Sequence, residues 1–201
     1  MGKKNLTGSR IAVYCASSAK ADKIYLNQAE YLAEDFIEKK VKLVFGGGKT
    51  GLMGHLASKV LASHGKVQGV MPNFLKNIEL NHPQVKDFIF VETMSERKHL
   101  LMKETEGLIA LPGGCGTLEE LLEAITLKRL GRYLKPIIIV NFDGFYDSLL
   151  ELLSKMVKEN FMRPEHLSLW TVVTDAKDAL SAIENTKDWE SSALQIATFK
   201  K

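Results

Sequence analysis

The chain has 201 residues, of which 45% are hydrophobic and 25% are charged, and its formal net charge is +3. This length predicts one domain over residues 1–201 rather than two independent domains. The near balance of charges gives no indication of a nucleic-acid or membrane partner, and we expect neither. Two cysteines, Cys15 and Cys115, are too few for a disulfide framework, so we expect a reducing, cytoplasmic environment.

Apolar runs of strand length alternate with segments of helical periodicity along the chain. From the N-terminus, we expect a strand over 10–16, a helix over 22–39, a strand over 41–45, a helix over 51–63 and a strand over 66–71. A strand over 88–91, a helix over 95–103, a strand over 108–111 and a helix over 118–130 follow. The last predicted elements are a strand over 136–140, a helix over 145–159, a strand over 171–173 and a helix over 176–185.

The predicted strands show little alternation of polar and apolar residues, which is typical of strands buried on both faces. Because helices separate them, we expect a doubly wound α/β fold, with a mainly parallel seven-stranded sheet flanked by helices. Seven strands fall short of the eight that close a barrel. We expect the core over about 10–185, a loop over the site at 73–86, and a tail or subunit contact over 187–201.

Two glycine clusters each follow a predicted strand and precede a predicted helix. The first is Pro112-Gly113-Gly114-Cys115-Gly116, after which Thr117 opens the helix. Glycines at a strand end let the backbone approach a ligand, and a helix N-terminus presents free N–H groups to an anion. This cluster predicts a phosphate site, with a tight turn capped by Thr117 as the alternative. Its spacing matches neither the Walker pattern nor G-x-G-x-x-G, which argues against ATP hydrolysis and hydride transfer.

The second cluster comprises Gly46, Gly47, Gly48, Gly51 and Gly54. The carboxyl ends of strands in an open α/β sheet lie on one edge, so this cluster and the first are expected to meet at one crevice. Two such turns in one small chain suggest a nucleotide or sugar-phosphate site. Close packing of helix on strand is the alternative for this cluster.

Two cations, Arg97 and Lys98, come shortly after the predicted strand 88–91. A strand end places them at the expected crevice. There a guanidinium can hold phosphate through two parallel hydrogen bonds, and an ammonium adds a point charge. Adjacent cations are also common on a solvated surface, which is the alternative for both.

Three carboxylates, Glu119, Glu120 and Glu123, lie in the first turns of the helix after the first glycine cluster. Carboxylates beside a phosphate site can bind ribose hydroxyls, orient water or stabilise an oxocarbenium-like transition state. The spacing Thr117-x-x-Glu120 also fits a capping box, which is the structural alternative for Glu120.

Metal and thiol chemistry receive no support from the sequence. The histidines show no metal-ligand spacing, so we expect no metal site; they are His55, His64, His82, His99 and His166. Cys115 has no evident partner base and is interpreted as a small filling residue.

Together these residues resemble the LOG (LONELY GUY) family of phosphoribohydrolases, many of whose members are labelled "lysine decarboxylase". The family's P-G-G-x-G-T-x-x-E is matched at 112–120, its G-G-G-x-x-G-L-M-G at 46–54, and its M-x-x-R-K at 94–98. The likeness covers about residues 10–164 and includes Cys15-Ala16-Ser17-Ser18, where Ala16 occupies a place often held by glycine.

This resemblance implies a Rossmann-like fold, a homodimer, and hydrolysis of the N-glycosidic bond of a purine nucleoside 5′-monophosphate such as AMP or an N6-modified AMP. It implies Arg97 and Glu120 as the catalytic pair and requires no cofactor. It implies substrate contacts at Ser17, Gly47, Gly48, Met94, Lys98, Gly113, Gly114, Cys115, Gly116, Thr117, Leu118, Glu119 and Thr126, and at Glu79 in an acidic loop position.

Two other functions stay open at this point. One is a non-catalytic nucleotide or molybdenum-cofactor carrier, because such carriers resemble this fold and share the glycine turn. The presence of both Arg97 and Glu120 argues against it. The other is a transferase that passes ribose phosphate to an acceptor other than water. A pyridoxal-dependent decarboxylase would need a Schiff-base lysine with pyridoxal partners, and no such constellation is evident.

Overall fold

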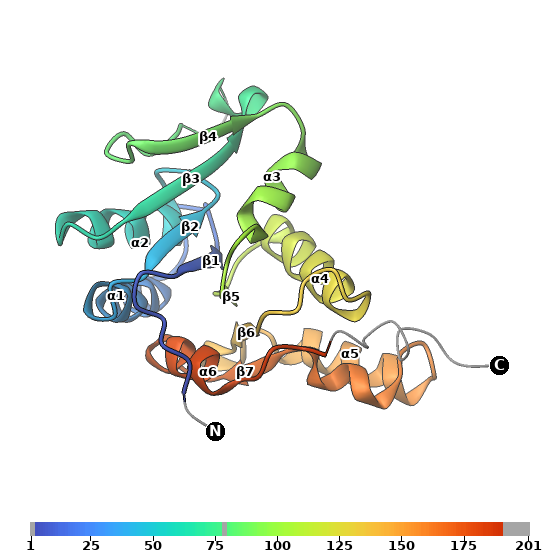
Figure 1. Ribbon diagram of the computed structural model, residues 1–201. Coiled ribbons are helices and arrows are strands. Elements are labelled where there is room, and N and C mark those ends of the chain that lie inside the picture. Colours follow the sequence, from blue (N-terminus) through green and yellow to red (C-terminus); the bar gives the residue numbers. More distant parts are fainter. Residues whose placement is uncertain (1–2, 78–79, 191–201) are drawn as a thin grey trace.

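A computed structural model describes residues 3–77 and 80–190 of the chain. Within them, seven parallel strands form one sheet in the order β4-β3-β2-β1-β5-β6-β7 (Figure 1). The strands are β1 (Arg10–Tyr14), β2 (Lys42–Phe45), β3 (Val67–Pro72), β4 (Asp87–Val91), β5 (Gly107–Ala110), β6 (Ile137–Val140) and β7 (Thr171–Val173). This confirms the predicted doubly wound, seven-stranded α/β fold.

Helices cover both faces of the sheet. The α-helices are α1 (Lys23–Glu38), α2 (Gly51–Ala62), α3 (Met94–Met102), α4 (Cys115–Arg129), α5 (Asp147–Lys158) and α6 (Ala179–Asn185). Short 3₁₀ segments are η1 (Asn73–Asn77), η2 (Phe142–Gly144), η3 (Pro164–Leu169) and η4 (Ala176–Asp178). One buried apolar cluster joins the sheet to α1, α2 and α6, and a second joins it to α3 and α4 (Figure 1).

The chain reverses its direction of travel across the sheet at β1. The strands β2, β3 and β4 extend to one side of β1, whereas β5, β6 and β7 extend to the other (Figure 1). The connections on the two sides therefore diverge at β1 and β5 and leave a crevice at the strand carboxyl ends. Ligands of open α/β sheets bind at such a reversal.

Most predicted element boundaries lie within two residues of the observed ones, and α4 is the main exception. It begins at Cys115 with Gly114 as its N-cap residue, three residues before the predicted start at 118. The sequence suggested a later start because Thr117 is a good N-cap residue and glycine a poor helix former. The predicted last helix, 176–185, divides into η4 and α6.

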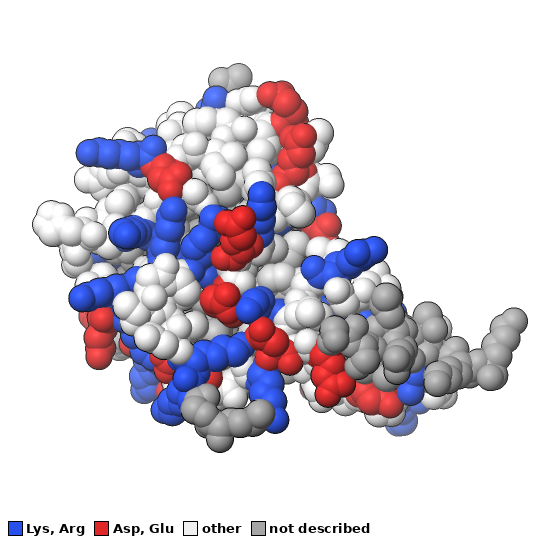
Figure 2. All heavy atoms as spheres, viewed as in Figure 1, with Lys and Arg blue, Asp and Glu red and all other residues white. Residues whose placement is uncertain are grey.

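Charges of both signs lie interspersed on the face shown in Figure 2. Ion pairs among the described residues include Lys42 with Asp87 at 2.8 Å and Lys135 with Glu106 at 2.7 Å. Among the described residues, none of the helices combines the length and apolar character that crossing a membrane requires.

Gly54, in the second turn of α2, provides a test of this packing. A methyl group built on it would lie 1.9 Å from the carbonyl oxygen of Lys49, a backbone atom that cannot turn away. Alanine in a helix gains about 1 kcal/mol over glycine, but overpacking against backbone costs more, about 3 kcal/mol. The net cost of about 2 kcal/mol predicts that Gly54→Ala lowers the melting temperature by roughly 6 °C in calorimetry.

Gly116→Ala is the matched control for this substitution. It also introduces alanine near a helix start, but no atom lies within 4 Å of the added methyl group. We expect its melting temperature to equal or exceed that of the wild type. Equal stability of the two variants would contradict the packing described for α2.

Candidate active site

A pocket of about 310 Å³ lies at the reversal point, where the loops after β1, β2 and β5 meet. Its volume falls at the lower end of the range for small-molecule sites. The residues that line it are Val13, Tyr14, Cys15, Ala16, Ser17, Gly46, Met53, Arg97, Gly114, Cys115, Gly116, Thr117 and Glu120. The structure thus brings seven of the predicted site residues together: Ser17, Arg97, Gly114, Cys115, Gly116, Thr117 and Glu120.

The N-terminus of α4 forms one wall of this pocket. No side chain caps it, and the first intrahelical hydrogen bond is donated by the Leu118 amide to the Gly114 carbonyl, at 3.1 Å. The amides of Cys115, Gly116 and Thr117 precede that bond and are the free donors of a helix start. Space is open beside Gly114 and Gly116, where an added methyl group would meet no atom within 4 Å. This arrangement suits a phosphate group.

Gly113 has a different role from its neighbours. A methyl group on Gly113 would lie 2.1 Å from the hydroxyl oxygen of Thr117. Gly113 does not line the pocket, and Thr117 is 5% exposed. This glycine is required for packing of the turn against α4, whereas Gly114 and Gly116 leave room for a ligand.

Arg97 reaches the pocket from α3 and is 8% exposed. Its Nη1 lies 3.2 Å from Oε1 of Glu120, and its Nε donates to the carbonyl of Val70 in β3 at 3.3 Å. A methyl group on Gly46 would lie 2.3 Å from its Nη2. The guanidinium is therefore confined by groups from β2, β3 and α4, which fixes its position at the pocket.

A capping box fixes the start of α3 and hence the position of Arg97. The Thr93 hydroxyl accepts a hydrogen bond from the Glu96 amide at 3.1 Å. The Glu96 carboxylate in return accepts from the amides of Thr93 and Glu92 at 3.1 and 3.0 Å. Such reciprocal bonds satisfy helix N-terminal donors that would otherwise lack partners.

Glu120 is not part of a capping box, which excludes the structural alternative for this residue. Because α4 starts at Cys115, Glu120 lies in its second turn, and Thr117 is a helical residue rather than a cap. Glu120 is 8% exposed and pairs with Arg97. A buried ion pair costs desolvation energy that its attraction offsets only with good geometry, so it is weak evidence for stability. At a pocket it indicates function instead.

The second glycine cluster is used mainly for packing. The N-terminus of α2 is covered, because the Met53 amide donates to the Ala16 carbonyl at 3.2 Å and the Thr50 hydroxyl donates to the Ser17 carbonyl at 2.8 Å. Gly51, with φ of +64°, would clash with the Ser17 backbone at 2.5 Å if it carried a side chain. This helix start has no room for a phosphate, in contrast to that of α4.

Gly47 and Gly48 lie outside the pocket and contact the segment after residue 79. The His82 amide donates to the Gly47 carbonyl at 2.9 Å, and Gly48 forms an antiparallel bridge with Asn81. Within the predicted loop 73–86, Asn81 and His82 thus contact the second glycine cluster, and none of its described residues lines the pocket. Glu79, the predicted contact from this loop, falls outside the described residues.

Lys98 lies beside the pocket in a cluster with two carboxylates of α4. Its Nζ is 2.5 Å from Oε1 of Glu119 and 2.9 Å from Oε2 of Glu123. The hydrogen bonds that Lys98 donates to Glu119 and Glu123 raise its pKa. Glu119 and Glu123 thus share one cation, which offsets the repulsion between two like charges four residues apart on a helix.

Three predicted contacts lie away from the lining. Leu118 packs against the apolar cluster beneath α4, Met94 is 36% exposed at the start of α3, and Thr126 is exposed six residues beyond Glu120. Six residues of helix span about 9 Å, so Thr126 is nearly two turns from the catalytic candidate.

Six lining residues were not among the predicted contacts: Val13, Tyr14, Cys15, Ala16, Gly46 and Met53. Tyr14 was predicted only as part of a strand, and Gly46 only as one glycine of a cluster. The available signal was position, because Tyr14 is the last residue of β1 and strand carboxyl ends face the ligand.

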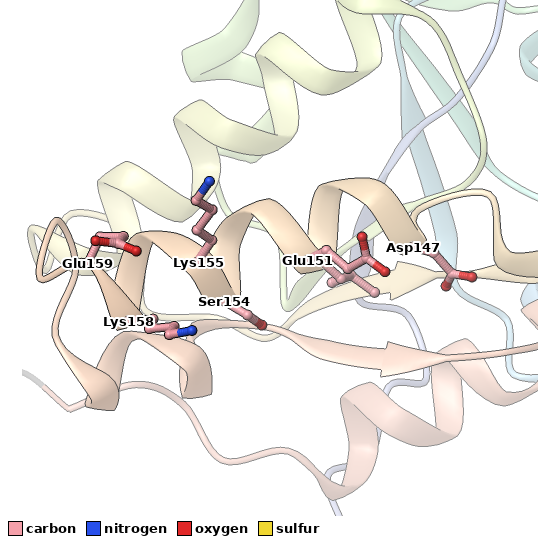
Figure 3. Close-up of a pocket in the computed structure, with 7 residues that line it drawn as sticks. Asp147, Glu151, Ser154, Lys155, Lys158 and Glu159 are labelled. Atoms are coloured by element: carbon pink, nitrogen blue, oxygen red, sulfur yellow. The ribbon is translucent and has the colours of Figure 1, made fainter.

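A larger hollow of about 610 Å³ lies along α5. All of its lining residues come from α5 and the residue that follows, and Figure 3 shows Glu151, Lys155 and Lys158 along this single helix. Among the described residues, no second element closes this hollow, and its charges are of both signs, so the pocket at the strand ends is the better candidate.

Comparison with known proteins assigns the family. The family model described as "Possible lysine decarboxylase" matches residues 53–183. A probable cytokinin riboside 5′-monophosphate phosphoribohydrolase of Oryza sativa subsp. japonica, LOGL9, is 38% identical over 175 residues, which is 87% of this chain and 77% of that protein. The cytokinin riboside 5′-monophosphate phosphoribohydrolase LOG1 of Arabidopsis thaliana is 38% identical, covering 94% of this chain and 93% of its own. The chain belongs to the LOG family.

Solved structures support the Rossmann-like fold of this LOG protein. The molybdenum cofactor carrier protein of Chlamydomonas reinhardtii superposes with a TM-score of 0.66 at 19% identity, over 88% of this chain and 96% of that one. The molybdenum cofactor binding protein of Rippkaea orientalis gives 0.65 at 21% identity, over 88% and 95%. At such identities the likeness concerns the fold alone.

Gly46 tests the confinement of Arg97 in this LOG site. The methyl group of Gly46→Ala would displace the end of a flexible side chain rather than backbone, so we expect little change in melting temperature. We expect kcat for nucleotide cleavage to fall about 100-fold, because a small misplacement of a catalytic group has effects of that order. Steady-state kinetics and calorimetry measure the two effects; unchanged kcat would show that Arg97 does not need this position.

Proposed function

We propose that this LOG protein hydrolyses the N-glycosidic bond of purine nucleoside 5′-monophosphates, with Arg97 and Glu120 as its catalytic pair. The observation that carries the proposal is the buried pair of Nη1 of Arg97 and Oε1 of Glu120, 3.2 Å apart, beside an uncapped helix N-terminus. The names of the relatives, which are phosphoribohydrolases of cytokinin riboside 5′-monophosphates, support the same reaction.

The substrate would bind with its 5′-phosphate on the amides of Cys115, Gly116 and Thr117. Neither Gly114 nor Gly116 carries a side chain that would block this approach. The negative phosphate is stabilised by the positive end of the α4 dipole. This contact anchors one end of the nucleotide and leaves the ribose to extend along the pocket towards Glu120.

In the chemical step, water attacks C1′ of the ribose as the bond from C1′ to the base nitrogen breaks. The bond's electron pair leaves with the base, the water gives its oxygen to C1′ and loses one proton, and the base gains one proton, so the products are the free base and ribose 5-phosphate. Positive charge develops on the sugar ring, and the Glu120 carboxylate stabilises it and directs the water. Arg97 orients Glu120 and stabilises negative charge on the phosphate or departing base.

The pocket does not suit the decarboxylase named in the family description. A pyridoxal-dependent decarboxylase needs a lysine that forms a Schiff base. No lysine is among the described residues that line the pocket. Lys98, beside the pocket, is instead engaged by Glu119 and Glu123.

The decisive assay incubates the protein with AMP and separates released adenine. We expect Arg97→Ala to lower kcat by about 10²–10³, the usual loss on removing an electrostatic catalytic group. We expect Glu120→Gln to lower it by about 10²–10⁴, because Gln keeps the shape and loses the charge. Parallel incubations with GMP, CMP and N6-isopentenyl-AMP define the preferred base.

Two controls distinguish a loss of catalysis from a loss of folding, and an enzyme from a non-catalytic carrier. Each variant should melt below the wild type, because it leaves one charge of a buried pair without its partner, but it should keep a single cooperative unfolding transition above the assay temperature. Wild-type protein that binds AMP without releasing adenine would favour a carrier function. Adenine release at equal rates by the wild type and both variants would show that Arg97 and Glu120 are not the catalytic pair.

We further propose that the chain assembles as a homodimer in the cytoplasm. The apolar residues that α5 and its neighbours expose support an interface, because Leu152 is 49% and Phe161 is 77% exposed. Exposed apolar surface of this kind marks interaction sites when it is contiguous.

Sedimentation analysis tests this assembly. We expect wild-type protein to sediment as a dimer and the double variant Leu152→Glu, Phe161→Glu as a folded monomer, because buried charges would be unpaired. Ile24→Glu is the control: Ile24 is 40% exposed on α1, across the sheet, and its replacement should leave the dimer intact. A monomeric wild type at micromolar concentration would refute the proposal.

A further inference from the structure

Tyr14, the last residue of β1, has a buried hydroxyl that the reaction described above does not use. The residue is 2% exposed and lines the pocket. Its ring packs in the apolar cluster beneath α3 and α4, with Leu101 and Leu121. Among the described residues, its hydroxyl oxygen has no hydrogen-bond partner.

An unpaired hydroxyl at this depth requires an explanation. Burying a donor without an acceptor is costly, and phenylalanine would fill the same space without that cost. A role in catalysis is one of the recognised reasons for such a group, and Tyr14 lines the candidate active site. Tyr133, in the same apolar cluster, differs from Tyr14 in this respect: its buried hydroxyl has a partner, the Thr105 hydroxyl, at 3.1 Å.

The charged and titratable groups near the Tyr14 hydroxyl come from two helices and the loop after α4. They are Glu120 and Glu123 of α4, Arg97 of α3, and Tyr133. Burial raises the pKa of Tyr14 well above its ordinary value, and the negative charge of Glu120 is the next largest cause. The hydroxyl therefore keeps its proton and is a donor close to the catalytic carboxylate.

We propose that Tyr14 is a positioning residue, whose hydroxyl donates a hydrogen bond to the Glu120 carboxylate when substrate is bound. Arg97 approaches Oε1 of that carboxylate, and a carboxylate has several acceptor sites, so a second donor can be accommodated. When Arg97 engages the phosphate or base of the substrate, the hydroxyl keeps Glu120 ionised and directed at C1′. This inference rests on the proposed role of Glu120.

The test compares Tyr14→Phe with Tyr133→Phe, each of which removes one buried phenolic oxygen. With AMP as substrate, we expect Tyr14→Phe to lower kcat about tenfold or more, with KM within about twofold of wild type. We also expect the acidic limb of its pH–kcat profile to move to higher pH, because a donor that favours the carboxylate is gone.

The two tyrosine substitutions should change the melting temperature in opposite directions relative to the wild type. Tyr14→Phe should melt at or above the wild-type temperature, because an unpaired polar atom is removed. Tyr133→Phe should melt lower, because it loses a hydrogen bond, and should keep the wild-type kcat. Unchanged kcat in Tyr14→Phe, or a change in KM alone, would overturn the inference.

Combination with Glu120→Gln shows whether Tyr14 acts through the carboxylate. We expect Tyr14→Phe to have no further effect on the residual rate of Glu120→Gln, since interacting residues are not additive. An equal loss of rate in both backgrounds would refute action through Glu120.

A measurement without turnover separates this inference from the proposed function. A ¹³C NMR titration of the Glu120 carboxyl, in the presence of ribose 5-phosphate, should have its midpoint at higher pH in Tyr14→Phe than in wild type. If wild-type protein releases no base and this shift is still observed, the proposed function fails and the contact stands. Identical titrations would refute the contact whatever the activity.

Discussion

The reversal of chain direction between β1 and β5 is the constraint on which the site depends. Strands on the two sides of this point are connected by helices on opposite faces of the sheet, so the loops after β1 and β5 diverge. The Ala16 amide nevertheless donates to the Pro112 carbonyl at 3.1 Å and joins these loops. The Ala16 carbonyl accepts from Met53 of α2. One short loop thus connects the start of α2 to the turn before α4.

The interactions that do not stabilise the fold are concentrated at the pocket. Two ionised side chains from different helices, Arg97 and Glu120, are removed from water there, and an uncapped helix start faces the same space. Neither arrangement favours folding. The surrounding strands supply the compensating stability, since all four residues of β5 and of β6 are buried. Buried, apolar strands in the middle of the sheet therefore support a site that is itself unfavourable.

The sequence predicted the fold well because strand and helix periodicities agree with the tertiary structure along nearly the whole chain. It placed Arg97 and Glu120 near one crevice because both follow strands whose ends lie on the same edge. It left the capping-box alternative open for Glu120, since a glycine N-cap at Gly114 has no distinctive local pattern. It also could not separate Gly114 and Gly116, which have open space around them, from Gly113 and Gly54, which are closely packed. That distinction depends on neighbours distant in sequence.

The uncovered amides at the start of α4 have a consequence for how specificity changes within such a protein. Anion binding there comes from the main chain, and no charged side chain has to be retained for it. Substitutions elsewhere around the pocket, for example at Met53, can alter the shape offered to the base while the phosphoryl group stays anchored. The phosphate, which all nucleotides share, is thereby recognised separately from the base, which differs between them. Selectivity for the base can therefore change while phosphate binding is kept.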